Sequence, residues 1–240
     1  MQDGLYVALS SQIALERRLN TIADNVANAS TVGFRATGVK FEDVVSGLGQ
    51  KSVAFVSSGD TYLSTASGAL RQTGNPLDFA IKGDAWFGID TPAGIVMTRD
   101  GRFTMQEDGQ LVTVEGYSVL DAGGAPIQLD PRNGTPEAGA DGMLRQAGQP
   151  VGAIGLFTFD PGVNFTRFAN SGIIPNGAPQ PVVDRIEVSV VQGYVEESNV
   201  NPILEMTRLI SVQRAFENTA ALMRSSEQTF SEAVKTLGSK

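Results

Sequence analysis

The chain has 240 residues, neither cysteine nor histidine, and a formal net charge of −8 at pH 7. Without cysteine there are no disulfides or thiolate metal sites, and without histidine the usual general base and the commonest metal ligand are missing. The acidic charge argues against nucleic acid, which requires a basic surface on its partner. We therefore expect no enzyme, no catalytic residue, no metal, no cofactor and no nucleic-acid partner.

Charge and glycine divide the chain into three zones. Residues 36–200 hold 19 acidic and 10 basic side chains, whereas residues 1–35 and 201–240 are nearly neutral. Gly4 is the only glycine in the first 30 residues, and Gly238 is the only one in the last 40. Because glycine marks turns, this pattern predicts two helical ends that face protein and a turn-rich middle that faces solvent.

The N-terminal zone predicts an amphipathic helix over residues 4–31. Apolar side chains recur every three or four residues from Leu5 to Ala29. Asp3 can cap the start of this helix, and Gly33 can end it in a left-handed conformation. The first 20 residues lack the basic start and the apolar stretch of a secretory signal, and no apolar run is long enough to insert into a membrane.

The side of this helix opposite the apolar stripe carries few charges. It presents Thr21, Asp24, Asn25 and Asn28, where a free surface helix would normally carry Lys and Glu. An amide that is hydrogen-bonded is much less costly to bury than a charge, and it both donates and accepts. This face is therefore predicted to be a second packing surface.

The middle zone predicts an antiparallel β domain. Runs rich in Val, Ile, Phe and Thr are separated by turn signals such as Thr91-Pro92-Ala93-Gly94. Their spacing fits a sandwich or a barrel. The β runs lie at 78–81, 85–90, 94–105, 110–120, 151–160 and 185–191. Residues 36–75 are weaker in pattern, and either an extended connector or extra strands would fit them.

The C-terminal zone predicts a second long helix. Asn201 and Pro202 match an N-cap followed by the first helical residue. An apolar stripe then runs along the helix, with occasional polar interruptions. It comprises Met206, Leu209, Gln213, Phe216, Ala220, Met223, Glu227, Phe230, Val234 and Leu237.

Three blocks of the sequence resemble the flagellar rod and hook axial proteins. The first is NTIADNVANASTVGFR at residues 20–35, and the third is EESNVNPILEMTRLISVQRAFE at 196–217. The second combines GALRQTGNPLDFAIKGDAWFGI at 68–89 with TRDGRFTMQEDGQLVTVEGYSVL at 98–120. The order and spacing of the blocks resemble the family over nearly the whole chain, and the proximal-rod members most.

The resemblance implies an α+β fold in which the N- and C-terminal helices form a coiled helical domain with an inserted, mainly antiparallel β domain. The implied boundaries are 1–35 for the N-terminal assembly helix, 36–75 for the connector or extra strands, 76–197 for an outer β-rich domain and 198–240 for the C-terminal assembly helix. It also implies a structural subunit of the basal-body rod that polymerises through its terminal helices.

The same resemblance implies partners, location and interface. The partners are other rod proteins, copies of the chain and the flagellar export apparatus. The location is the basal body in the periplasm, reached without a cleaved signal peptide and without membrane insertion. The expected subunit interface comprises Leu5, Leu15, Leu19, Ile22, Asn25, Val26, Asn28, Asn199, Asn201, Met206, Leu209, Phe216, Met223 and Phe230.

Other interpretations remain open from the residues alone. The two terminal helices can pair within one chain as a hairpin, because apolar stripes usually mark a core. A distal-rod member of the same family is one alternative, and a secreted β-sandwich binding module with a helical stalk is another. A glycosidase would need two flanking carboxylates, but the candidates Asp84, Asp100, Asp108 and Glu115 lie in or beside turns, where Asp is common.

Overall fold

The computed structural model describes residues 2–46, 53–57, 59–183 and 187–238, and the chain divides into two compact units. Both ends of the chain belong to unit 1, whereas most of the middle belongs to unit 2. Unit 1 comprises Met1–Ala27, Thr37–Tyr62 and Asn201–Lys240, and unit 2 comprises Asn28–Ala36 and Leu63–Val200. The fold is α+β with mainly antiparallel sheets, as expected.

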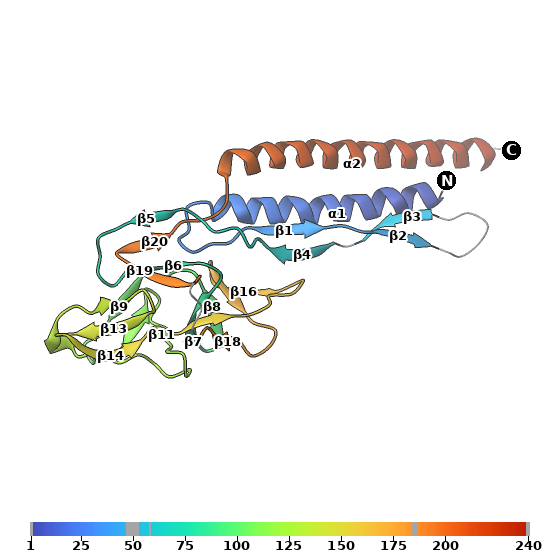
Figure 1. Ribbon diagram of the computed structural model, residues 1–240. Coiled ribbons are helices and arrows are strands. Elements are labelled where there is room, and N and C mark those ends of the chain that lie inside the picture. Colours follow the sequence, from blue (N-terminus) through green and yellow to red (C-terminus); the bar gives the residue numbers. More distant parts are fainter. Residues whose placement is uncertain (1, 47–52, 58, 184–186, 239–240) are drawn as a thin grey trace. The chain divides into compact units, whose positions relative to one another are not determined.

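Two long helices dominate unit 1 (Figure 1). Helix α1 spans Gln2–Ala27, and α2 spans Pro202–Gly238. The expectation that the first helix reaches residue 31 is wrong, because a turn follows Ala27 in which the Thr31 N–H donates to the Asn28 carbonyl at 3.1 Å. The predicted start of α2 is confirmed, since the Asn201 side chain accepts from the Leu204 N–H at 3.1 Å.

Short strands complete unit 1 along α1. Strand β1, Thr37–Lys40, pairs with β4, Asp60–Leu63, and β2, Asp43–Ser46, pairs antiparallel with β3, Val53–Val56. Helix α1 contacts both β1 and β3. The stretch 36–75 therefore contains strands, including part of unit 2 at β5, Leu70–Gln72.

Unit 2 is built from short strands. In the part of unit 2 that the structure describes, these are β6 (Phe79–Lys82), β7 (Trp86–Thr91), β8 (Gly94–Thr98), β9 (Phe103–Met105), β10 (Leu111–Thr113), β11 (Ser118–Val119), β12 (Glu137–Ala138), β13 (Met143–Gln146), β14 (Gln149–Ala153), β15 (Leu156–Thr158), β16 (Thr166–Phe168), β17 (Gly172–Ile174), β18 (Gln180–Pro181), β19 (Ser189–Gln192) and β20 (Tyr194–Glu196), with a short 3-10 helix at Pro131–Asn133. Each of the six predicted β runs contains a strand, although residues 185–186 of the last run lie outside the described residues.

The largest sheet runs in the order β16-β17-β8-β7-β11-β10-β9, with β15 paired to β7 and β18 to β15. Strands β7 and β8 form an antiparallel hairpin that turns at the predicted residues, with Thr91 opposite Gly94. Smaller sheets pair β6 with β19, β5 with β20, and β13 with β12 and β14. The last strand, β20, thus returns to pair near the start of unit 2.

The core of unit 2 is apolar and aromatic. Phe79, Phe87 and Leu111 are fully buried, and the rings of Phe87 and Phe103 meet edge to face at 5.2 Å. Trp86 lies in a neighbouring buried cluster on the other side of β7. Both residues of the Trp86-Phe87 pair are therefore core residues, as their alternation along a strand requires.

Candidate assembly surface and buried ionic cluster

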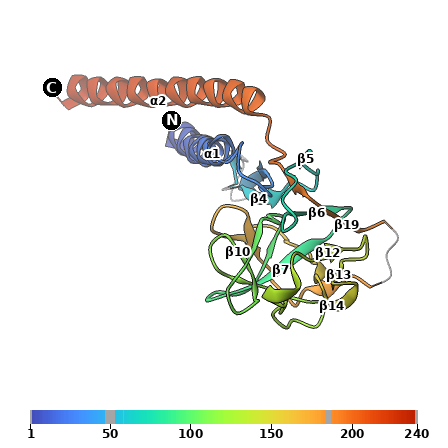
Figure 2. The same cartoon turned by 90° about the vertical axis from the view of Figure 1, so that its left-hand side faces the viewer.

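The two helices of unit 1 pack against each other in opposite directions (Figures 1 and 2). The face of α2 that is most buried carries Glu205, Leu209, Val212, Phe216 and Met223. This stripe differs from the predicted one at several positions. Val212 is buried whereas the predicted Gln213 is exposed, and Glu205 is buried whereas Met206 is exposed. The predicted positions Glu227, Val234 and Leu237 are exposed as well. An aliphatic residue, Val212, therefore lies on the buried face in place of the Gln213 amide.

Most of the predicted interface residues of α1 are buried or half-buried within their own chain. Ile22 is buried, and Leu15, Leu19 and Val26 are half-buried. In the C-terminal part Leu209, Phe216 and Met223 are half-buried, while Asn201 and Met206 are exposed. The side chains of Leu5 and Phe230 lie outside those that the structure describes.

Three asparagines of the expected interface make hydrogen bonds within the chain. Asn25 is only 4% exposed, and its amide donates to the Thr37 carbonyl and accepts from the Thr37 N–H, both at 2.9 Å. Asn28, at the turn after α1, accepts from the Thr31 hydroxyl at 3.0 Å. Asn199 accepts from the Ala36 N–H at 2.7 Å. Asn25 and Asn199 thus have hydrogen-bond partners within their own chain, and their role in a subunit interface stays a prediction.

Two rows of apolar side chains face solvent on the helices. The α2 row is Ile203, Met206 and Ile210, and the α1 row is Tyr6, Leu9 and Ile13. In each row the spacing of three and four residues places the side chains on one face. All six are between 44% and 78% exposed. Of these six residues, only Met206 belongs to the interface expected from the sequence, although the spacing of all six is visible there.

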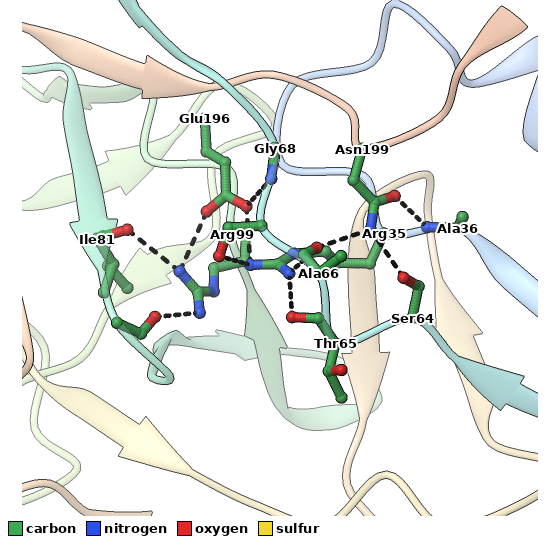
Figure 3. A network of polar contacts seen from close by, with 12 residues as sticks. Arg35, Ala36, Ser64, Thr65, Ala66, Gly68, Ile81, Arg99, Glu196 and Asn199 are labelled. Atoms are coloured by element: carbon green, nitrogen blue, oxygen red, sulfur yellow. Dashed lines mark hydrogen bonds and ion pairs between the residues drawn. The ribbon is translucent and has the colours of Figure 1, made fainter.

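Unit 2 contains a buried ionic cluster, which we define as Arg35, Arg99 and Glu196 (Figure 3). The Arg35 guanidinium lies 2.8 Å from one Glu196 oxygen, and the Arg99 guanidinium lies 3.1 Å from the other. Each side chain is at most 2% exposed. The Gly68 N–H also donates to the Glu196 carboxylate, at 3.0 Å.

Carbonyl groups satisfy most of the remaining guanidinium donors. Arg35 donates to the Thr65 carbonyl at 2.9 Å and to the Ala66 carbonyl. Arg99 donates to the carbonyls of Ile81 at 3.2 Å and of Gly83 at 2.7 Å. The cluster therefore joins three distant stretches of unit 2 by charge-assisted hydrogen bonds, which are stronger than neutral ones.

In this cluster, burial and the negative charge of Glu196 shift the pKa values of the two arginines in opposite directions. Desolvation lowers the pKa of Arg99 to about 10, while the negative charge of Glu196 opposes the shift. Burial likewise lowers the pKa of Arg35, again opposed by Glu196 and then by Asp84. Both guanidinium groups are thus charged at neutral pH and depend on one buried carboxylate. The Trp86 ring lies beside both, at 5.8 Å from Arg35 and 5.3 Å from Arg99.

The cluster also ties together the two segments that connect to the helices. The Gly33 N–H donates to the Glu196 carbonyl at 2.7 Å, and the Asn199 N–H donates to the Phe34 carbonyl at 3.3 Å. Gly33 has a φ of +70°, and a Cβ at this position would lie 2.2 Å from the Asp100 nitrogen. Residues 28–36 and 196–200 are therefore held as one layer by backbone bonds that require glycine at position 33.

The described residues form neither a metal site nor a membrane span. Within the described ranges, no three carboxylates gather in a way that could hold a metal ion. Neither described helix combines the length and apolarity that crossing a membrane requires.

Comparison with known protein families matches three segments of the chain. A model described as flagella basal body rod protein matches residues 5–35, and one described as the D1 domain of the flagellar hook protein FlgE/F/G matches 80–146. A third, the C-terminal part of flagellar basal body rod FlgEFG proteins, matches 191–236. Each matched segment contributes one member of the ionic cluster: Arg35, Arg99 and Glu196 respectively.

Curated relatives extend the match over the whole length. The flagellar basal-body rod protein FlgF of Mesorhizobium japonicum is 74% identical over 240 residues, which is 100% of both chains. The FlgF of Rhizobium meliloti is 58% identical over 99% of both chains. The rod protein FlgG of Bacillus subtilis is 32% identical over 98% of both chains. The chain belongs to the flagellar basal-body rod protein family and, within it, is more similar to FlgF than to FlgG.

Proposed function

We propose that this chain is a non-enzymatic subunit of the proximal part of the rod, which polymerises through its terminal helices into the axial drive shaft. The observation that carries the proposal is the α2 row, Ile203, Met206 and Ile210, whose apolar side chains face solvent. A soluble monomer rarely leaves such a continuous apolar surface uncovered, whereas an assembling subunit buries it against a neighbour.

The division into two units supports separate roles for the ends and the middle. We assign assembly to residues 1–35 and 198–240, in a coiled helical domain, and an outward-facing role to the β-rich residues 76–197. Residues 36–75 connect these regions. Part of this stretch, Thr37–Tyr62, belongs to unit 1, where its strands lie along α1. Helix α1 contacts β1 and β3 of this stretch in addition to α2.

Neighbouring rod proteins and further copies of the chain are the partners in this proposal. Export occurs through the flagellar export apparatus into the periplasm, without a cleaved signal peptide. The exposed rows provide distinct patches on α1 and α2, and the different contacts of an open helical assembly need such patches.

A pair of charge substitutions tests the proposal. In Met206→Glu/Ile210→Glu both side chains are exposed, so the monomer should keep its helix content while incorporation into basal bodies falls at least about tenfold. The matched control, Ser211→Glu/Asn218→Glu, places the same charges at exposed polar positions on the same helix. The proposal fails if the apolar-row variant assembles and supports swimming as well as the control does.

A further inference from the structure

An apolar cavity of about 240 Å³ opens on unit 1 beside α1. It is lined by Ser11, Ala14, Leu15 and Arg18 of α1 together with Phe41 and Val56 from the strand side. Ala14 is buried and Leu15 is half-buried, whereas Arg18 is exposed at the rim. The cavity is thus largely apolar, with one positively charged side chain at its edge.

The end of α2 carries apolar side chains that the described residues of unit 1 leave exposed. Val234 is 67% exposed and Leu237 is 81% exposed. Helix α2 has 37 residues and α1 has 26, so at about 1.5 Å per residue α2 is roughly 16 Å longer. Figure 1 shows α2 continuing past the N-terminal end of α1. The stripe that packs on α1 therefore extends beyond its partner helix.

We infer that the end of α2 from one copy of the chain inserts Val234 into this cavity of a second copy. The inference rests on the proposed function and specifies one of its contacts. The cavity and the inserted side chain lie on different parts of unit 1, so the contact joins two different surface patches, head to tail. A contact of this type repeats from copy to copy instead of closing after two.

Charge and spacing favour a second copy as the occupant. Glu227 is exposed and lies seven residues before Val234, on the same face of α2. Arg18 lies seven residues after Ser11, also on one face of α1. Seven residues span about 10 Å in both helices. In an antiparallel alignment, Val234 over Ser11 therefore brings the Glu227 carboxylate to the Arg18 guanidinium.

The absence of cysteine from the sequence permits a direct cross-linking test. Two differently tagged variants, Ser11→Cys and Val234→Cys, are co-expressed, and isolated basal bodies are oxidised mildly. Because each chain then has a single cysteine, any disulfide joins two copies. We expect a cross-link between the two tags, and none when Ser211→Cys replaces Val234→Cys. Absence of the mixed cross-link in assembled basal bodies overturns the inference.

Exchange of the two charges gives an independent readout. Arg18→Glu and Glu227→Arg should each lower the amount of chain in basal bodies, by about tenfold. The double variant carries both changes in every copy and should restore incorporation. Failure of the double variant to rescue, while the unsubstituted chain is present in basal bodies, overturns the inference alone. Absence of the unsubstituted chain from basal bodies would overturn the proposed function itself.

Discussion

Replacing Glu196 by glutamine should strongly destabilise unit 2. The change keeps the shape of the side chain but removes the only carboxylate in the ionic cluster, leaving Arg35 and Arg99 buried and charged. One amide oxygen then replaces two charged oxygens, and the new NH₂ group faces guanidinium donors. Removal of one partner from a buried ion pair typically costs about 3–5 kcal/mol, because the other charge is left without compensation.

The neighbouring residue supplies a matched control. Glu197 pairs with Arg71 at 2.9 Å, but these side chains are 48% and 52% exposed. Solvent screens such a pair, so Glu197→Gln should cost less than about 1 kcal/mol. Two adjacent glutamates with similar ion-pair distances are thus expected to differ several-fold in their contribution to stability.

The assay uses a reporter that the chain already has. Trp86 is the only tryptophan in the sequence, and its ring lies beside both guanidinium groups. Urea unfolding of the full chain, followed by tryptophan fluorescence, should show a loss of about 3–5 kcal/mol for Glu196→Gln. If Glu196→Gln lowers the free energy of unfolding no more than Glu197→Gln does, the buried carboxylate does not hold the two arginines as described.

Three further changes test local features by the same unfolding assay or by helix content. Asn25→Ala removes two hydrogen bonds to Thr37 and should cost about 2 kcal/mol, and a neutral result would contradict the role given to this buried amide. Gly33→Ala should cost clearly more than Gly74→Ala, since both have positive φ but only Gly33 has a backbone nitrogen 2.2 Å from the added Cβ; equal costs would show that the clash is relieved. Asn201→Ala should cost about 1 kcal/mol by removing the cap of α2, and unchanged stability and helix content would show that the cap is dispensable.

Local features of the fold were predictable from the sequence. Asn201 and Pro202 mark the start of α2 because their preferences are local, and β7 and β8 follow from alternation on both sides of a turn. The predicted end of α1 lies four residues beyond the observed one, since Ala29 continues the apolar pattern while the Thr31 N–H bonds the Asn28 carbonyl in a turn.

The ionic cluster was not predictable from residue patterns. Its members are separated by 64 and 97 positions in the chain, and no local periodicity relates Arg35, Arg99 and Glu196. A hint was available, since each lies within one of the three blocks that resemble the family. Charged residues inside such blocks, next to buried residues such as Phe34 and Val195, are candidates for a buried ion pair.

The partner of the amide-rich face of α1 is a second feature that the sequence does not predict. The sequence predicts that Asn25 needs hydrogen-bond partners and lies at a subunit interface; the structure gives it Thr37 of the same chain as a partner, and the interface stays a prediction. Composition indicates that a polar side chain will be buried without indicating which chain buries it. The spacing of the rows on α1 and α2 is visible in the sequence, but only the structure shows that these apolar side chains are uncovered.

The most direct test of assembly through the helices is the labelling rate of a single cysteine on the α2 row. In Met206→Cys the thiol should react rapidly with a maleimide in the purified monomer, because this position is exposed. In isolated rods we expect protection of at least about tenfold, while Ala122→Cys, on an exposed turn of unit 2, stays reactive in both. Equal labelling of Met206→Cys in monomer and rod would show that α2 does not contact a neighbouring subunit through this row.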